Sequence, residues 1–366
     1  MMFQFKRIAV KIGSNVLTKA DGTLDVDWMS ILVAQVARLH REGIEIILIS
    51  SGAVASGRGE LKGQKKLDAV SQRQLFSAVG QAKLINRYYE LFRKHQIICG
   101  QVLTTKENFS SRRHYLNQKN CMTVMLEAGV IPIVNENDTI SVTELMFTDN
   151  DELSGLIATM MGAEALIILS NIDGIYDGNP QDPSAKVIPT IEPGGKDLSI
   201  FIQSGKSSFG RGGMQTKYRI ARKVAEEGVT VMIANGRQED ILPKLLEKDS
   251  RQCCTRFIAN PKSASNVKKW IAHSDGFAKG EIQVNEGARN ALLGNSATSL
   301  LPVGITQVKG EFEKDDIVRI ISESGEQMGV GRVSYDHRRV RELMGKKGNK
   351  PVVHYDHLYL ELLLSD

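Results

Sequence analysis

Short apolar runs recur along the first 235 residues, and most of them stop abruptly at Ser, Gly, Asn or Asp. Such runs are typical of strands buried on both faces of a parallel sheet. Helix-like segments separate them, as around Leu32, Val36 and Leu39, where apolar residues are spaced by three and four. This alternation predicts an α/β fold with a mainly parallel sheet sandwiched by helices. We expect strands at residues 7–12, 44–49, 97–103, 131–134, 165–169 and 230–233.

Polar residues follow several of these predicted strands at the point where each strand ends. Residues 50–53 (Ser-Ser-Gly-Ala), 135–138 (Asn-Glu-Asn-Asp) and 170–171 (Ser-Asn) occupy such positions. In open α/β sheets, ligands bind in the crevice at the carboxyl ends of the strands. The pattern therefore predicts one ligand site along one edge of the sheet.

A further polar cluster, Asp149-Asn150-Asp151-Glu152, opens a helix-like segment that runs to Met161. Asp149 as N-cap with Glu152 three residues later resembles a capping box, which would give the cluster a purely structural role. Alternatively, the cluster extends the predicted ligand site. These residues by themselves leave both interpretations open.

The hydrophobic pattern changes after about residue 260. Residues 261–275 have the composition of a linker, and short strands with Gly-marked turns follow, near 282–284, 304–308, 317–321 and 330–333. We expect three parts: an α/β domain over residues 1–260, a linker over 261–275, and a small β-rich domain over 276–366. The length of 366 residues agrees with two domains.

Composition describes an ordinary globular protein, with 42% hydrophobic and 24% charged residues. No apolar run reaches the ~20 residues that a membrane helix needs, and the N-terminus lacks the features of a signal peptide. The four cysteines show no metal-type spacing, so we expect reduced thiols in a cytoplasmic protein. A net charge of +5 leaves room for anionic small molecules without indicating nucleic acid.

Two of the features suited to phosphate lie near the N-terminus. Lys11 is within the first predicted strand, where a charge costs free energy unless it projects from the strand end toward an anion. An edge-strand lysine that extends to solvent is the structural alternative. Ser51 and Gly52 belong to a loop whose backbone N–H groups and hydroxyls could form an anion nest, although a plain strand-to-helix turn has similar composition.

The third such feature is a glycine-rich segment at residues 210–217, Gly-Arg-Gly-Gly-Met-Gln-Thr-Lys, which opens a predicted helix ending near 227. Glycines let the backbone approach a phosphate, and a helix N-terminus carries about half a positive charge. Lys217 would then reach a transferring phosphoryl group from the first turn. The segment lacks the Gly-Lys-Ser/Thr ending of a P-loop, and a flexible loop is the structural alternative.

Two lysines and an anion nest suit phosphoryl transfer, which depends mainly on positioning and charge stabilisation. A carboxylate nucleophile and a nucleotide phosphate repel each other by roughly 4 kcal/mol per charge pair, at about 4 Å and an effective dielectric of about 20. Lys11, Lys217 and a magnesium ion that bridges the phosphates would offset this repulsion. An ionised nucleophile needs no general base, which agrees with the absence of a Ser-His-Asp or His-rich cluster.

Five motifs occur in order along the chain, and together they are typical of a known family. They are residues 10–14 (Val-Lys-Ile-Gly-Ser), 50–53 (Ser-Ser-Gly-Ala), 134–138 (Val-Asn-Glu-Asn-Asp), 149–151 (Asp-Asn-Asp) and 212–217 (Gly-Gly-Met-Gln-Thr-Lys). They resemble the amino-acid kinase superfamily, and within it the members that phosphorylate glutamate at the first step of proline biosynthesis. Residues 280–288 and 299–304 are similar to the PUA domain appended to bacterial members, so the resemblance covers essentially the whole chain.

The resemblance implies that ATP phosphorylates the γ-carboxylate of L-glutamate to give γ-glutamyl phosphate. It implies that Ser51, Gly52, Asp138 and Asn150 bind glutamate, with Asp138 suited to the α-ammonium by charge. Lys11 and Lys217 would stabilise the transferred phosphoryl group, and Asp151 would orient both lysines. The implied nucleotide-binding residues are Lys11, Ser170, Asn171, Arg211, Gly212, Gly213, Met214, Gln215, Thr216 and Lys217.

Two positions depart from the family pattern. Ser170-Asn171 stands where the family usually has Thr-Asp, so one acidic contact to the nucleotide is lost, for which the neighbouring Asp173 could substitute. Arg211 stands where threonine is common, and it would either contact a phosphate or face solvent. The sequence does not indicate which protein groups, if any, bind the magnesium ion.

The resemblance also implies partners. They are glutamate, ATP with magnesium, proline as a feedback inhibitor, and a glutamate-5-semialdehyde dehydrogenase (γ-glutamyl phosphate reductase) that accepts the labile product. The family suggests homodimers or homotetramers. Other superfamily kinases with a different acid substrate are the nearest enzymatic alternative.

An RNA-binding function is the rival hypothesis from another class, because PUA domains elsewhere bind RNA. Residues 276–366 contain 12 Lys and Arg against 13 Asp and Glu, a net formal charge of −1. This balance lacks the basic footprint of an RNA-binding domain. We therefore expect a structural or regulatory role for this domain and no RNA binding.

Overall fold

The chain forms two compact units in a computed structural model. The first unit comprises Met1–Lys106 and Asn117–Ser263, and the second comprises Glu107–Leu116 and Ala264–Asp366. The residues that the structure describes are 3–61, 67–109, 112–140, 150–180, 182–195, 198, 213–248, 250–261, 271, 278–294 and 298–360. Most of the expected linker at 261–275 lies outside them.

An eight-stranded sheet forms the centre of the first unit, in the order β3-β4-β2-β1-β5-β7-β8-β6. Its strands are β1 (Arg7–Ile12), β2 (Glu45–Ser50), β3 (Cys99–Thr104), β4 (Ile131–Glu136), β5 (Ala165–Ser170), β6 (Thr190–Ile191), β7 (Thr230–Asn235) and β8 (Thr255–Phe257). Neighbouring strands pair in parallel except β7 and β8, which are antiparallel. The predicted mainly parallel sheet is thus confirmed.

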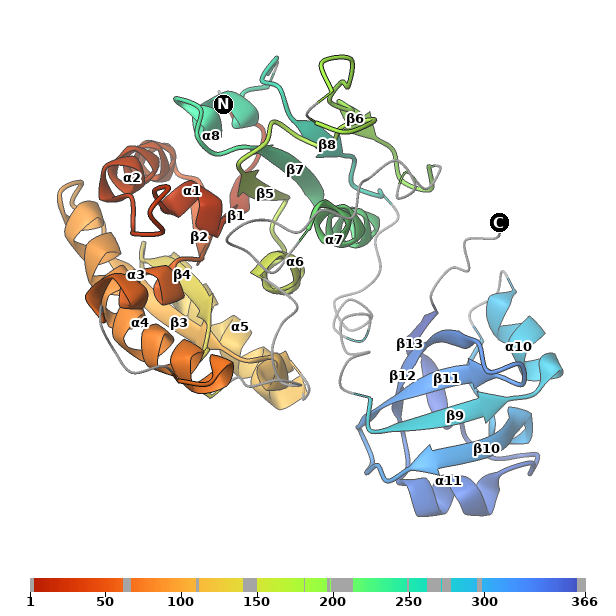
Figure 1. The fold of residues 1–366 in the computed structure, drawn as a ribbon. Coiled ribbons are helices and arrows are strands. Elements are labelled where there is room, and N and C mark those ends of the chain that lie inside the picture. Colours follow the sequence, from red (N-terminus) through yellow and green to blue (C-terminus); the bar gives the residue numbers. More distant parts are fainter. Residues whose placement is uncertain are drawn as a thin grey trace. The chain divides into compact units, whose positions relative to one another are not determined.

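Helices cover both faces of this sheet (Figure 1). The helices of this unit are α1 (Ser14–Leu17), α2 (Val26–Arg41), α3 (Ala53–Glu60), α4 (Ala69–Arg93), most of α5 (Arg112–Glu127), α6 (Asn150–Met161), α7 (Met214–Glu226) and α8 (Ile241–Leu246). The 3-10 helix η1 (Lys106–Phe109) follows β3 in the chain. Aspartate side chains cap two of the longest helices. Asp25 accepts a hydrogen bond from the Trp28 backbone N–H, and Asp68 accepts from those of Val70 and Ser71. Such caps satisfy N–H groups that would otherwise lack partners.

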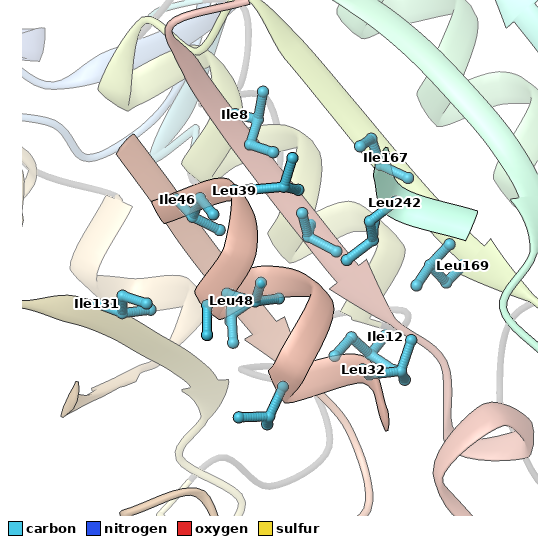
Figure 2. Packing of buried hydrophobic residues seen from close by; sticks show 14 of the residues in the cluster. Ile8, Ile12, Leu32, Leu39, Ile46, Leu48, Ile131, Ile167, Leu169 and Leu242 are labelled. Carbon is cyan, nitrogen blue, oxygen red and sulfur yellow. The ribbon is translucent and has the colours of Figure 1, made fainter. Parts of the chain in front are cut away.

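The alternation of side chains along β1 separates a core face from a site face. Ile8, Val10 and Ile12 are buried in one hydrophobic cluster with residues of α2, α4 and α8, part of which Figure 2 shows. Successive strand residues point to opposite faces, so Lys11 lies on the other face, toward α6 and α7. Each fully buried Ile or Leu contributes about 1.5–3 kcal/mol to folding. This burial fixes the register that places Lys11.

Helices α3 and α4 cross with their backbones in direct contact. A Cβ atom on Gly57 of α3 would overlap the carbonyl oxygen of Phe76, and one on Gly80 of α4 would overlap that of Ala53. Only glycine fits at both positions. We refer to this contact as the α3–α4 crossing.

The second unit contains a five-stranded sheet in the order β10-β9-β11-β12-β13. Its elements are β9 (Gly280–Val284), α10 (Glu286–Leu293), the 3-10 helix η5 (Pro302–Gly304), β10 (Ile305–Gly310), β11 (Ile317–Ser322), β12 (Gln327–Val333), α11 (His337–Leu343) and β13 (Val353–Leu360). The pair β9–β11 is parallel and the other pairs are antiparallel. A separate core that includes Ile282, Phe312 and Val340 supports this β-rich unit.

Two further observations concern the cysteines and the hydropathy of the helices. All four cysteines, Cys99, Cys121, Cys253 and Cys254, are free thiols. Within the described ranges, no helix is both long and apolar enough to cross a membrane.

Candidate functional site

A cavity of about 940 Å³ opens in the first unit, and its lining includes residues at or beyond the carboxyl ends of β1, β2, β4 and β5. These strands are neighbours in the sheet, so the ends of parallel strands bring together loops far apart in sequence, as expected for an α/β sheet. The predicted residues that line the cavity are Lys11, Ser51, Gly52, Asp138, Asn150, Asp151, Ser170, Asn171, Gly213, Met214 and Lys217.

Two lysines share one carboxylate at what we call the lysine end of the cavity. Lys11 Nζ lies 2.6 Å from Asp151 Oδ1, and Lys217 Nζ lies 2.8 Å from Asp151 Oδ2. The side chain of Asp151 is 1% exposed, while those of Lys11 and Lys217 are 7% and 11% exposed. Asp151 is on the first turn of α6, Lys11 is in β1 and Lys217 is on the first turn of α7. Three elements therefore converge on one carboxylate.

The protonation state of Asp151 follows from two opposing effects. Burial would raise its pKa, but the ammonium groups of Lys11 and Lys217 outweigh burial and hold the pKa well below its ordinary value. Asp151 is thus a carboxylate at neutral pH. One negative charge and two positive charges leave a net charge of +1, which attracts anions.

The predicted nucleotide residues near α7 divide into three groups. Gly213 is the N-cap of α7 and makes no side-chain capping bond, and it lines the cavity together with Met214. An N-terminus capped this way leaves backbone N–H groups and the helix dipole for an anion. Gln215 and Thr216 lie on the same turn and do not line the cavity. Arg211 and Gly212 lie outside the described residues, as does Asp149.

Asn150 connects two strand ends through its amide. Its Nδ2 donates toward the Ser50 carbonyl, Ser51 Oγ and Asn135 Oδ1, each at 3.1 Å. Gly52 follows with φ +103°, a left-handed conformation that a residue with a Cβ adopts only with strain. This turn presents Ser51 to the cavity and begins α3. The hydrogen bonds of Asn150 and the turn at Gly52 therefore both restrict the conformation of the loop after β2.

Two carboxylates and an arginine form what we call the carboxylate end of the cavity. Arg73 Nε donates to Asp138 Oδ1 at 3.0 Å, Arg73 Nη2 contacts the same oxygen, and Nη2 lies 3.6 Å from Glu136 Oε2. Burial raises the pKa of Asp138, an effect that Arg73 offsets only in part. Two acidic side chains against one arginine favour a cationic group on the ligand.

Several lining residues were not among the predicted site residues. Arg73 and Phe76 lie on α4, Arg58 lies on α3, and Asn135 and Glu136 end β4. The last two belong to a quoted motif but received no role, whereas Arg58 and Arg73 lie in ordinary helical sequence that carries no motif. Their helical spacing resembles that of a solvated face, so the sequence offered no signal for them.

Asp173, which was considered as a substitute for the missing acidic nucleotide contact, has other partners. Its Oδ1 accepts hydrogen bonds from Asn235 Nδ2 at 3.0 Å and Gln238 Nε2 at 2.8 Å. It is not among the residues that line the cavity. The geometry therefore gives it a structural role at the ends of β5 and β7.

Comparison with known families gives two matches. Residues 6–235 match the amino acid kinase family, and residues 280–355 match the PUA domain. The first match contains the whole cavity lining described above, and the second falls within the β-rich unit.

Individual relatives match this chain over nearly its whole length. The chain is 70% identical to a glutamate 5-kinase of Bacteroides thetaiotaomicron over 99% of its own length and 100% of the relative's length. It is 48% identical to the glutamate 5-kinase of Chlorobaculum tepidum, over 97% of this chain and 98% of the relative. It is 36% identical to that of Syntrophotalea carbinolica, over 99% of both chains. This chain therefore belongs to the amino acid kinase family and, within it, to the glutamate 5-kinases.

Proposed function

We propose that this protein transfers the γ-phosphoryl group of ATP to the γ-carboxylate of L-glutamate, producing γ-glutamyl phosphate and ADP. The observation that carries this proposal is the Lys11–Asp151–Lys217 triad, which faces the same cavity as the carboxylate end with its excess of acidic side chains. The full-length similarity to glutamate 5-kinases supports the same activity.

The lysine end supplies the electrostatic part of the reaction. A carboxylate oxygen of glutamate forms a bond to the γ-phosphorus while the bond from that phosphorus to the β,γ-bridging oxygen breaks, and ADP leaves with the electron pair. Both reactants are anions, so Lys11 and Lys217 reduce their repulsion and stabilise the charge on the transferring group. Asp151 holds the two ammonium groups in place and does not accept a proton. The nucleophile is already ionised and needs no general base.

The carboxylate end supplies selectivity for an amino acid. Asp138 matches the α-ammonium of glutamate by charge, and its burial strengthens such a pairing. Ser51 and Asn150 lie between the two ends and offer a hydroxyl and an amide to the carboxylate that reacts. Glutamate would thus span the cavity with its γ-carboxylate toward the lysines.

Magnesium is proposed to enter with the nucleotide. Within the described part of the chain, no group of three or more His, Cys, Asp or Glu side chains could hold a metal ion. Mg²⁺ commonly binds through substrate phosphates with one or two carboxylates and several waters. When bound, it would neutralise phosphate charge, and Gly213, Met214, Ser170 and Asn171 would line the nucleotide side.

Three further proposals concern partners. The acyl phosphate product hydrolyses readily, so a γ-glutamyl phosphate reductase would accept it. Proline would inhibit the enzyme, since it is the end product of the sequence that begins here. A homodimer or homotetramer is the proposed assembly. Adding proline and the reductase to kinase assays, and measuring mass by light scattering, tests each of these.

The activity is tested by ADP release with a panel of acceptors, each of which changes one feature of glutamate. Aspartate is shorter by one methylene, N-acetylglutamate lacks the ammonium charge, and UMP replaces the carboxylate by a phosphate. Hydroxylamine, which traps acyl phosphates as hydroxamates, identifies the product. We expect turnover with glutamate alone, and preferred turnover of another acceptor would contradict the proposal.

A further inference from the structure

Arg73 occupies a position at the carboxylate end that the proposed mechanism does not use. Its guanidinium contacts Asp138 through Nε and Nη2, and 25% of the side chain stays exposed. Glu136 and Asp138, in contrast, are only 4% and 9% exposed. Arg73 also lines the cavity. A partly exposed cation thus covers two buried anions at the end assigned to the amino-acid backbone.

An α-amino acid carries opposite charges on one carbon, and this imposes a requirement on the site. If Asp138 receives the ammonium, the neighbouring α-carboxylate needs a cation close to Asp138. The cations among the described lining residues are Lys11, Lys217, Arg58 and Arg73. Both lysines are paired with Asp151 at the other end. Arg58 lies over the ring of Phe76, with its Cζ 6.0 Å from the centroid. Arg73 is the cation of this set that contacts Asp138.

The donors of Arg73 are only partly used. Nε and Nη2 face Asp138, whereas Nη1 makes no hydrogen bond to any residue within the described ranges. A guanidinium group has five N–H donors in a planar fork that matches a carboxylate at two points. A ligand carboxylate in the cavity could therefore be bound by this planar pair of donors, and neither lysine would be needed for it.

We propose that Arg73 binds the α-carboxylate of the substrate by exchanging its ion pair with Asp138. On binding, the substrate ammonium takes the Asp138 carboxylate and the substrate carboxylate takes the Arg73 guanidinium. One internal ion pair is replaced by two across the ligand. The charges of Asp138 and Arg73 are already partly removed from water. Binding a substrate to them therefore requires less new desolvation than binding it to a fully hydrated charge would. This inference rests on the proposed function and gives that site its preference for zwitterionic α-amino acids.

A purely structural role for Arg73 predicts a different outcome. If Arg73 only orients Asp138, its loss weakens every ligand that has an ammonium group, with or without an α-carboxylate. If Arg73 binds the α-carboxylate, its loss weakens only ligands that have this group. Glutamate and 4-aminobutyrate separate the two roles, because both carry an amine and a terminal carboxylate and they differ in the α-carboxylate.

The test combines Arg73→Gln, Arg73→Lys and the control Arg87→Gln. Arg87 lies on the same helix and pairs with Glu90 at the surface. We expect Arg73→Gln to raise the glutamate KM about 10- to 100-fold with kcat little changed, as for a lost charge-assisted hydrogen bond. The affinity for 4-aminobutyrate, measured as inhibition of glutamate turnover, should change less than threefold. Arg73→Lys should restore part of the discrimination, and Arg87→Gln should behave as wild type. Equal losses for both ligands would overturn the inference.

Calorimetric binding of the same two ligands separates this inference from the proposed function. Binding that prefers glutamate in an Arg73-dependent way, without ADP release, would support the inference and refute the function. ADP release together with equal weakening of both ligands would support the function and overturn the inference. If wild-type protein binds neither ligand, both are overturned.

Discussion

Both ends of the cavity pair cationic with anionic side chains, but cations are in excess at one end and acidic side chains at the other. The lysine end places two cations on one carboxylate, and all three side chains are almost fully buried. The carboxylate end places one arginine against two carboxylates, and this arginine is a quarter exposed. The first arrangement is fixed and retains a net charge of +1 toward phosphate. The second has an excess of acidic side chains, and its arginine has room to exchange partners. We therefore propose that the chemical step and the selection of the acceptor use opposite ends of one cavity.

Removing the shared carboxylate should have the largest effect on this comparison. In Asp151→Asn, two nearly buried ammonium groups lose their counter-charge, and breaking such a pair costs about 3–5 kcal/mol. We expect a lower Tm together with a large loss of kcat, measured by thermal denaturation and ADP release. ATP should stabilise this variant more than wild type, since its phosphates restore negative charge. An equal ATP-induced Tm shift in both proteins would show that Asp151 does not balance the lysines.

Removing either cation should affect catalysis and leave acceptor binding nearly intact. We expect Lys217→Ala and Lys11→Ala to lower kcat by about 10²–10³-fold, the usual loss for one stabilising donor, or about 3–4 kcal/mol. The glutamate KM should change only a few-fold. The exposed Lys83, which pairs with Glu60 on the surface, provides the matched control as Lys83→Ala. Unchanged kcat in both site variants would remove the proposed mechanism.

Truncation of the residues proposed to bind glutamate, Asp138 at the carboxylate end and Asn150 between the two ends, should affect binding instead. Asp138→Ala and Asn150→Ala are expected to raise the glutamate KM by about 10- to 100-fold, in line with about 1.5–3 kcal/mol for hydrogen bonds to charged groups. The value of kcat should stay within a few-fold of wild type. Steady-state kinetics at saturating ATP decide this. A fall in kcat equal to that of the lysine variants would mean that the two ends are not functionally separate.

The smallest expected effect is a difference in pH dependence. Burial raises the pKa of Asp138 above its ordinary 3.8, so on acidification this carboxylate is protonated first and loses the substrate ammonium. The lysines lower the pKa of Asp151, so the lysine end stays ionised over the same range. The glutamate KM should therefore rise on acidification by up to about tenfold per pH unit, before kcat falls. A coincident fall of both parameters would argue against this order.

The raised pKa of Asp138 also has a consequence for folding. A carboxyl whose pKa is higher in the folded protein contributes stability below its unfolded pKa, and this contribution is lost as pH rises through the folded value. Relative to wild type, Asp138→Asn should therefore be more stable at neutral pH than it is, relative to wild type, at acidic pH. Denaturant unfolding of the two proteins at several pH values measures this difference.

The sequence predicted the strands of the first unit well because their signal is local. Continuous apolar runs located β1, β2 and β5 to within one residue. The short helix α3 was not expected, since it contains two glycines in eight residues and depends on packing against α4. The antiparallel pairing of β8 with β7 was also missed, because its strand is three residues long and its partner is chosen by tertiary contact.

The candidate site divides in the same way. Lys11, Asp151 and Lys217 lie in motifs, so the family resemblance brought them together although they are far apart in the chain. Arg73 carries no motif and has an ordinary position on a helix. Only the packing of α4 beside the end of β4 places its guanidinium against Asp138 and Glu136. Recognising it required the three-dimensional arrangement.

The α3–α4 crossing has a consequence for the width of the cavity. Ser51 immediately precedes the residue that caps α3, and Arg73 lies on α4. Their helices touch backbone to backbone at Gly57 and Gly80. The separation between the main-chain segments that carry Ser51 and Arg73 is then set by contact between backbone atoms. A larger residue at Gly57 or Gly80 would push the two helices apart and so widen the cavity between Ser51 and Arg73.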